Sequence, residues 1–188
     1  MPGDAVFDEL PGGDDPALRA EIAHRTASLL VRGARSMEDE DVTARIVRLA
    51  DDHGLDTVAD LWASAPPDSL PGALWRLYLL RSWVYAAPAT VAREFDAGRA
   101  RAQVAGVIAG VADPPGPEEL KAMADEVLRG IAGSDFADVL FRAAAFARVV
   151  ATGRAALPGS TGAEVRRMLA MAEQLESAGH AELRSRLV

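Results

Sequence analysis

The stretch LPGALWRLYLLRSWVYAA, residues 70–87, decides the fold because it is typical of a helix that is apolar on every side. On a helical wheel its only polar side chains, besides the tyrosine hydroxyls, are those of Arg76, Arg81 and Ser82. A helix that is apolar all round lies inside a domain or in an interface. We therefore expect residues 70–86 to form the central helix of the protein.

Segments on both sides of this helix have apolar residues at helical spacing, and they are separated by proline or glycine. No segment alternates polar and apolar residues as a half-buried strand does. The sequence thus predicts an all-α, single-domain bundle of seven or eight helices. The expected helical segments cover residues 15–35, 39–53, 56–63, 70–86, 88–97 (interrupted at Gly98 and followed by 99–111), 117–133, 135 to beyond 150, and a last segment that ends at Gly179.

The domain is expected to span residues 15–188, after an acidic leader over residues 1–14. Asp15 can cap the first helix, and Pro16 suits the first helical position because its missing N–H is not needed there. The leader lacks the basic start and apolar stretch of a signal peptide. No apolar run approaches the roughly 20 residues that span a bilayer. We expect a cytoplasmic protein without a membrane partner.

Composition argues against several classes of function. The chain carries a net charge of −8, which repels the phosphates of nucleic acids, so no nucleic-acid partner is expected. It has no cysteine, and its three histidines, His24, His53 and His180, form no metal-binding motif. Nucleophile and phosphate-loop motifs are absent. We expect no catalytic residue, no metal site and no cofactor.

Arg81 is the first candidate for a site residue. On the wheel its guanidinium lies within the apolar stripe, between Leu74 and Leu77. A buried guanidinium is costly unless a carboxylate pairs with it. One interpretation is a structural ion pair with Asp60, Asp125 or another helix; the other is an anchor for an anionic ligand or an acidic partner.

Four further candidates lie on the same helix. Arg76 and Trp83 are seven residues apart and share a face, so the guanidinium can stack on the indole. Arginine and aromatic residues are also enriched at the centres of protein interfaces. Core packing is the alternative. The candidate ligand or partner site therefore consists of Arg76, Tyr78, Arg81, Trp83 and Tyr85.

Two patterns extend beyond the single helix. Residues 57–86 and 120–152 each place Ala-Asp ahead of a Leu-aromatic-Arg motif, which is either an internal repeat or chance similarity between helices rich in Ala, Leu and Arg. The stretch LWASAPPDSLPGALWRLYLLRSWV, residues 61–84, resembles a segment of a family of uncharacterised all-helical proteins of high-GC actinobacteria. That resemblance implies a helical fold and no particular activity.

Three hypotheses for function follow. The first is a non-catalytic interaction or accessory protein that acts through helix faces, with a protein partner or a second copy of itself. The second is a small-molecule-binding protein, in which an anionic or apolar ligand occupies a pocket beside residues 70–86. The third is an enzyme of unrecognised type, with carboxylates that converge on Arg81.

Overall fold

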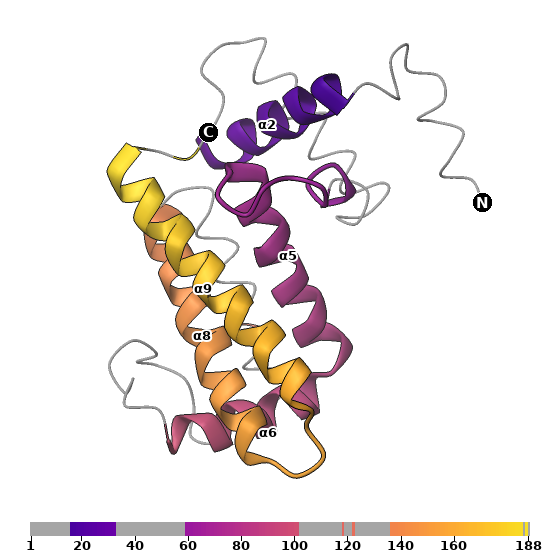
Figure 1. Ribbon diagram of the computed structural model, residues 1–188, viewed down its shortest axis with the longest axis vertical. Helices are drawn as coiled ribbons and strands as arrows, with labels where there is room; N and C mark the ends of the chain where they lie inside the picture. Colours follow the sequence, from indigo (N-terminus) through magenta and orange to yellow (C-terminus); the bar gives the residue numbers. More distant parts are fainter. Residues whose placement is uncertain are drawn as a thin grey trace, which may run out of the picture.

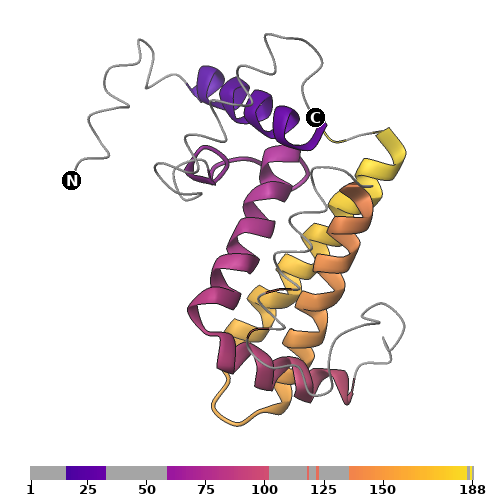
Figure 2. The ribbon, with the colours of Figure 1, turned by 180° about the vertical axis from the view of Figure 1, so that it is seen from behind.

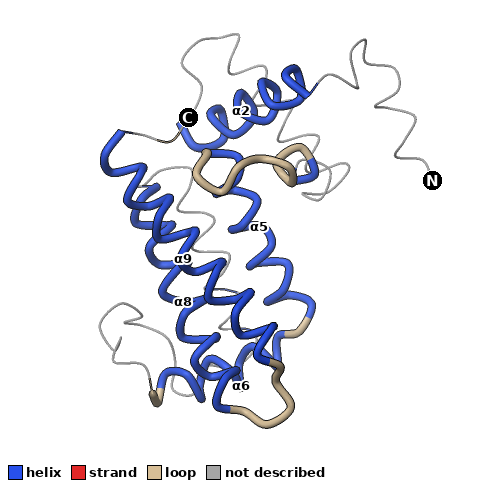
Figure 3. The backbone as a smooth tube through the Cα atoms, viewed as in Figure 1, coloured by secondary structure: helices blue, strands red, loops and turns tan. Residues whose placement is uncertain are grey.

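The structure is a computed structural model, which describes residues 16–32, 59–101, 118, 122, 136–185 and 187. Five α-helices lie within these ranges, and no strand does, which confirms an all-α fold for the described part of the chain (Figure 3). The expected helix 39–53, nearly all of 99–111, and all of 117–133 except residues 118 and 122 lie outside it. The helices are α2 (Pro16–Arg32), α5 (Leu70–Ala86), α6 (Pro88–Arg99), α8 (Phe136–Ala156) and α9 (Gly162–Ser185).

The helices pack around an α8–α9 hairpin. These two helices run antiparallel and share the most extensive contact in the described structure (Figure 1). The next most extensive contact is between α6 and α8, which cross at the end near the α8–α9 loop, while α2 covers the opposite end beside the C-terminus (Figures 1 and 2). Helix α5 runs along the side of the hairpin and joins the two ends.

The helix that is most completely buried is α8, and not α5 as the sequence had indicated. Buried residues surround α8 on all sides except one strip. Helix α5 buries one side, which includes Leu70, Leu77 and Val84, whereas Trp75 and Tyr78 on its other side are partly exposed. Alanines explain the difference, because small side chains let α6 and α9 approach α8 closely, and large aromatic rings on α5 reach the surface.

Local sequence fixes both ends of α5. Ser69 is the N-cap, and its Oγ accepts a hydrogen bond from the N–H of Gly72 at 3.2 Å. Gly72 must be a glycine, since a Cβ there would overlap the carbonyl oxygen of Pro66. Pro88 then begins α6 directly after Ala87, so the chain turns a sharp corner between α5 and α6.

Two glycines that the sequence analysis treated as helix breaks are inside helices. Helix α6 continues through Gly98, and α9 continues through Gly179 to Ser185. Both glycines are at close helix contacts: a Cβ on Gly98 would overlap the carbonyl oxygen of Val149, and one on Gly179 would lie 2.8 Å from the Phe141 ring. The predicted short helix 56–63 is also wrong in part, because the chain forms turns from Leu61 onward.

No helix in the described ranges is both long enough and apolar enough to cross a membrane.

Candidate functional site

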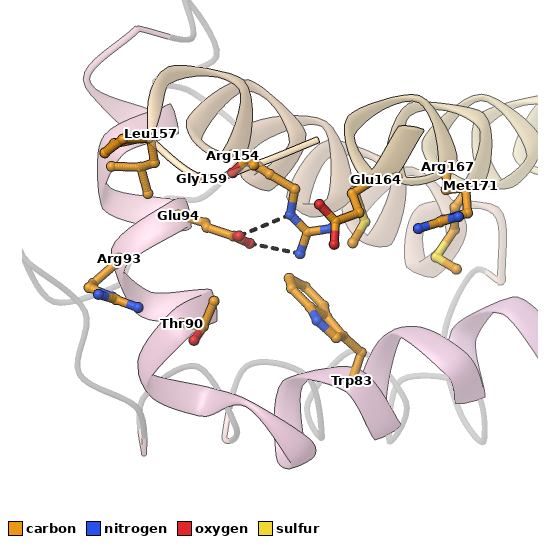
Figure 4. Close-up of a pocket in the computed structure, with 13 residues that line it drawn as sticks. Trp83, Thr90, Arg93, Glu94, Arg154, Leu157, Gly159, Glu164, Arg167 and Met171 are labelled. Atoms are coloured by element: carbon orange, nitrogen blue, oxygen red, sulfur yellow. Dashed lines mark hydrogen bonds and ion pairs between the residues drawn. The ribbon is translucent and has the colours of Figure 1, made fainter. Parts of the chain in front are cut away.

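A pocket of about 790 Å³ lies where α5 ends, next to α6, the end of α8 and the start of α9 (Figure 4). Part of its wall is apolar, and includes the side chains of Trp83, Leu157, Met168 and Met171. The charged residues of the wall are Arg93, Glu94, Arg154, Glu164 and Arg167. Clefts of this size with an apolar wall and a few polar groups are typical of small-molecule sites.

The crossing of α6 and α8 positions the central ion pair of this pocket. A Cβ on Gly153 would overlap the carbonyl oxygen of Glu94 and would lie 2.6 Å from the nitrogen of Gly98. Because the two helix backbones touch here, the side chain of Glu94 on α6 lies directly opposite that of Arg154 on α8. The close contact thus depends on glycine at both helices.

Glu94 and Arg154 form a bidentate ion pair. Nε and Nη2 of Arg154 donate to Oε1 and Oε2 of Glu94, each at 2.9 Å (Figure 4). The side chains are only 8% and 13% exposed, and Glu94 is the buried charged residue of the described core. Parallel charge-assisted bonds of this kind hold a guanidinium in one orientation.

The Nη1 edge of the Arg154 guanidinium is open. A guanidinium has five N–H groups, and Glu94 is the only hydrogen-bond partner of Arg154 among the described residues. No buried side-chain nitrogen in the described residues lacks a partner, so Nη1 of Arg154, which makes no bond to Glu94, is not fully buried, and Arg154 lines the pocket. The Arg154 guanidinium also lies over the Trp83 indole, 4.9 Å from the ring centroid.

The start of α9, at the edge of the pocket, is capped by its own residues. Thr161 and Glu164 form a capping box, in which Glu164 accepts from the N–H of Thr161 at 2.9 Å and from its hydroxyl at 2.8 Å. These bonds, the backbone bond first, lower the pKa of Glu164 below its ordinary value of 4.5. Glu164 is therefore a carboxylate at neutral pH and is held by its own helix.

Of the five site residues expected from the sequence, Trp83 lines the pocket. The guanidinium over its ring belongs to Arg154 rather than to Arg76, which the sequence had suggested. Arg76 instead ties α5 to α9: its Nε donates to Gln174 Oε1 at 2.6 Å and its Nη1 to the Gly72 carbonyl at 2.7 Å. Burial lowers the pKa of Arg76.

The other three expected residues, Tyr78, Arg81 and Tyr85, do not line this pocket. The Arg81 guanidinium lies over the Tyr85 ring, 4.3 Å from its centroid, and Tyr78 stacks on Trp75 with 5.4 Å between centroids. Asp125, one of the carboxylates considered for Arg81, lies outside the described residues. These aromatic rings and Arg81 form a separate row along the partly exposed side of α5.

Sequence reasoning missed the charged residues of the pocket, Glu94 and Arg154 above all. Both lie close to a glycine inside a helix: Glu94 is one helical turn before Gly98, and Arg154 follows Gly153. A glycine inside a helix often marks a close backbone contact. Treating Gly98 as a helix break concealed the crossing and the pair that it positions.

The pocket offers groups that can bind a small molecule. The described residues contain no group of three or more His, Cys, Asp or Glu side chains that could hold a metal ion. What they offer is an oriented cation, an indole and an apolar wall. No protein-family model, no curated protein and no solved structure matches the chain.

Proposed function

We propose that this protein binds a small organic anion, without catalysis, in the pocket between the end of α5 and the helices α6, α8 and α9. The observation that carries the proposal is the open edge of Arg154, which Glu94 holds in place beside the Trp83 ring. An oriented guanidinium next to an apolar wall can bind a charged group and a hydrocarbon group of one molecule together.

The electrostatic setting supports an anion. The protein as a whole carries a net charge of −8, yet three arginines and two glutamates line the pocket, which leaves one net positive charge there. A local positive potential in an otherwise acidic protein attracts small anions to this position.

The test uses four probes with the same eight-carbon body: octanoate, suberate, 1-octanol and octylammonium. The readout is the indole N–H signal of each tryptophan in NMR spectra. Trp62 is buried, and its indole donates to Thr26 at 3.2 Å, and Trp75 stacks on Tyr78 on another side of α5, so both are internal references. We expect octanoate to shift the Trp83 signal and leave the other two in place.

A pair of variants on one helical turn locates the binding. Thr90 lines the pocket, and a Thr90→Phe substitution places a ring inside it, whereas Ala89 is exposed and outside it. We expect Thr90→Phe to abolish the shift and Ala89→Phe to leave it unchanged. If no probe shifts the Trp83 signal, or if both variants respond alike, the pocket is not a binding site for small molecules.

The second candidate function is the interaction role expected from the sequence, with a second copy of this chain as the partner. The row of Trp75, Tyr78, Arg81 and Tyr85 supports it, because such residues dominate interface energetics and Tyr85 is 38% exposed. Sedimentation velocity tests it. We expect the wild-type protein to be a dimer and the Tyr78→Ser/Tyr85→Ser variant to be a monomer. The control Leu183→Ser changes an exposed apolar residue of α9 and should remain a dimer. A wild-type monomer across the micromolar range would contradict this function.

The setting of the protein is likewise a proposal. We place it in the cytoplasm, as one domain of seven or eight helices over residues 15–188, with no nucleic-acid or membrane partner. Its support is the acidic charge of the chain and the absence of a membrane-spanning helix among the described ranges.

A further inference from the structure

We infer that the ligand of the pocket is an amphipathic mono-anion, with a single carboxylate-like group on the open edge of Arg154 and a hydrocarbon body along Trp83 and Met171. This inference rests on the proposed binding function and specifies its ligand. It follows from the burial of Arg154, from the charges around the pocket and from the character of the wall.

Arg154 is the best anchor of the three pocket arginines. Arg93 and Arg167 are exposed, so water competes for their N–H groups and weakens any bond they make to an anion. Arg154 is largely buried, and its orientation is already fixed by Glu94. A guanidinium that is ordered before binding loses little conformational entropy when an anion arrives.

Charge limits the ligand to one anionic group. Two arginines are left in the wall once Arg154 is balanced by Glu94, and Glu164 lies near Arg154 and Arg167, whose charges help to lower its pKa. One net positive charge remains, which a mono-anion neutralises. A second anionic group would have to leave water without a second buried cation to pair with, because Arg93 and Arg167 are exposed, and Glu94 and Glu164 would repel it.

The rest of the wall fits a hydrocarbon body. Figure 4 shows the Trp83 ring beside the Arg154 guanidinium, with Met171 further along the same pocket. Met168, Leu157 and Pro158 add apolar surface. Methionine side chains are flexible and adapt to bodies of different shape, so the wall accepts an alkyl chain and places its head group at Arg154.

The same four probes rank the ligand class. We expect octanoate to bind at least about tenfold more tightly than 1-octanol, since a hydrogen bond to a charged group contributes about 10- to 100-fold in affinity. We expect suberate and octylammonium to bind more weakly still. If 1-octanol matches octanoate, Arg154 is not an anchor; if suberate binds more tightly than octanoate, the site takes a di-anion. Either result overturns this inference and leaves the binding function standing.

A double variant isolates Arg154. A single substitution of Arg154 would leave Glu94 charged and buried, whereas Glu94→Leu/Arg154→Met removes the pair together and keeps one net positive charge in the pocket. We expect the double variant to lose about 10- to 100-fold in octanoate affinity and to keep its affinity for 1-octanol. Arg93→Ala and Arg167→Ala should each change octanoate binding by less than about threefold. A double variant that binds octanoate as wild type does would refute the anchor, and circular dichroism shows that it is folded.

Discussion

Two buried arginine–glutamate pairs join helices at opposite ends of the molecule. They differ in the groups that surround them. At one end, Arg32 of α2 donates to both carboxylate oxygens of Glu182 on α9, at 2.5 and 2.8 Å. At the other end, Arg154 also donates to both carboxylate oxygens of Glu94, but through Nε and Nη2, whereas Arg32 uses Nη1 and Nη2. Their burial is nearly equal, with side chains 16% and 8% exposed in the first pair and 13% and 8% in the second.

The surroundings of the two pairs are different. Glu182 also accepts a hydrogen bond from the backbone N–H of Leu187 at 2.8 Å, so the first pair joins α2, α9 and Leu187. Arg154 borders the pocket and lies over Trp83. The same ion chemistry closes the fold at one end and, in our proposal, presents a guanidinium edge to a ligand at the other.

The largest effect on stability is expected from adding a side chain at the α6–α8 crossing. A Gly153→Ala variant would place its Cβ against the backbone of Glu94 and Gly98, which cannot move aside as a side chain can. We expect it to lower the free energy of unfolding by more than about 3 kcal/mol, measured by urea denaturation. Gly162→Ala is the control, because its Cβ meets only the flexible Arg166 side chain at 3.3 Å, and its effect should be under about 0.5 kcal/mol. Equal effects would show that the crossing is not tight.

Removing only the arginine of either buried pair should have the next largest effect on stability. Arg154→Met leaves Glu94 as a buried carboxylate without its cation, and Arg32→Met removes both Arg32 bonds from the buried carboxylate of Glu182. Each is expected to cost about 3 kcal/mol. The double variants Arg32→Met/Glu182→Leu and Glu94→Leu/Arg154→Met should recover most of that loss, since the charge and its partner are removed together. A thermal or urea series in which the doubles are no more stable than the singles would contradict this account.

Sequence patterns predicted the helices but not the ion pair of the pocket. Helical spacing located α5, and the Asp15-Pro16 signal located the start of α2, because both depend on neighbours within a few residues. The pair of Glu94 and Arg154 joins residues 60 positions apart, and it depends on a backbone contact between two glycines. No pattern within one helix encodes such a contact, so the sequence placed Trp83 in the site and missed its cation.

A third pair between helices, Arg148 with Glu176, tests the role of burial in this comparison. It joins α8 to α9 at 2.6 Å, but its side chains are 40% and 39% exposed. Exposed pairs contribute little because water and salt screen them. We expect Arg148→Ala to cost less than about 1 kcal/mol in urea denaturation. A loss as large as that of Arg154→Met would show that burial does not separate the pairs.

The smallest effect on stability is expected from lowering the pH. Bonds to Thr161 lower the pKa of Glu164, and the bond to Arg148 lowers the pKa of Glu176, both below the ordinary 4.5. A carboxyl whose folded pKa is depressed adds stability above its unfolded pKa and loses it as pH falls through the folded value. The destabilisation caused by Glu164→Gln should therefore be present at about pH 7 and should shrink below about pH 4. A pH-independent difference in thermal midpoint would contradict the capping bond.

The most direct test of the central claim is one NMR titration with octanoate, followed at the Trp83 indole N–H in two double variants. Both variants lose a buried arginine–glutamate pair, one at each end of the molecule. We expect Arg32→Met/Glu182→Leu to bind octanoate with the wild-type affinity, and Glu94→Leu/Arg154→Met to lose about 10- to 100-fold in affinity. Equal affinities in the two variants would contradict the role of Arg154 as the anchor.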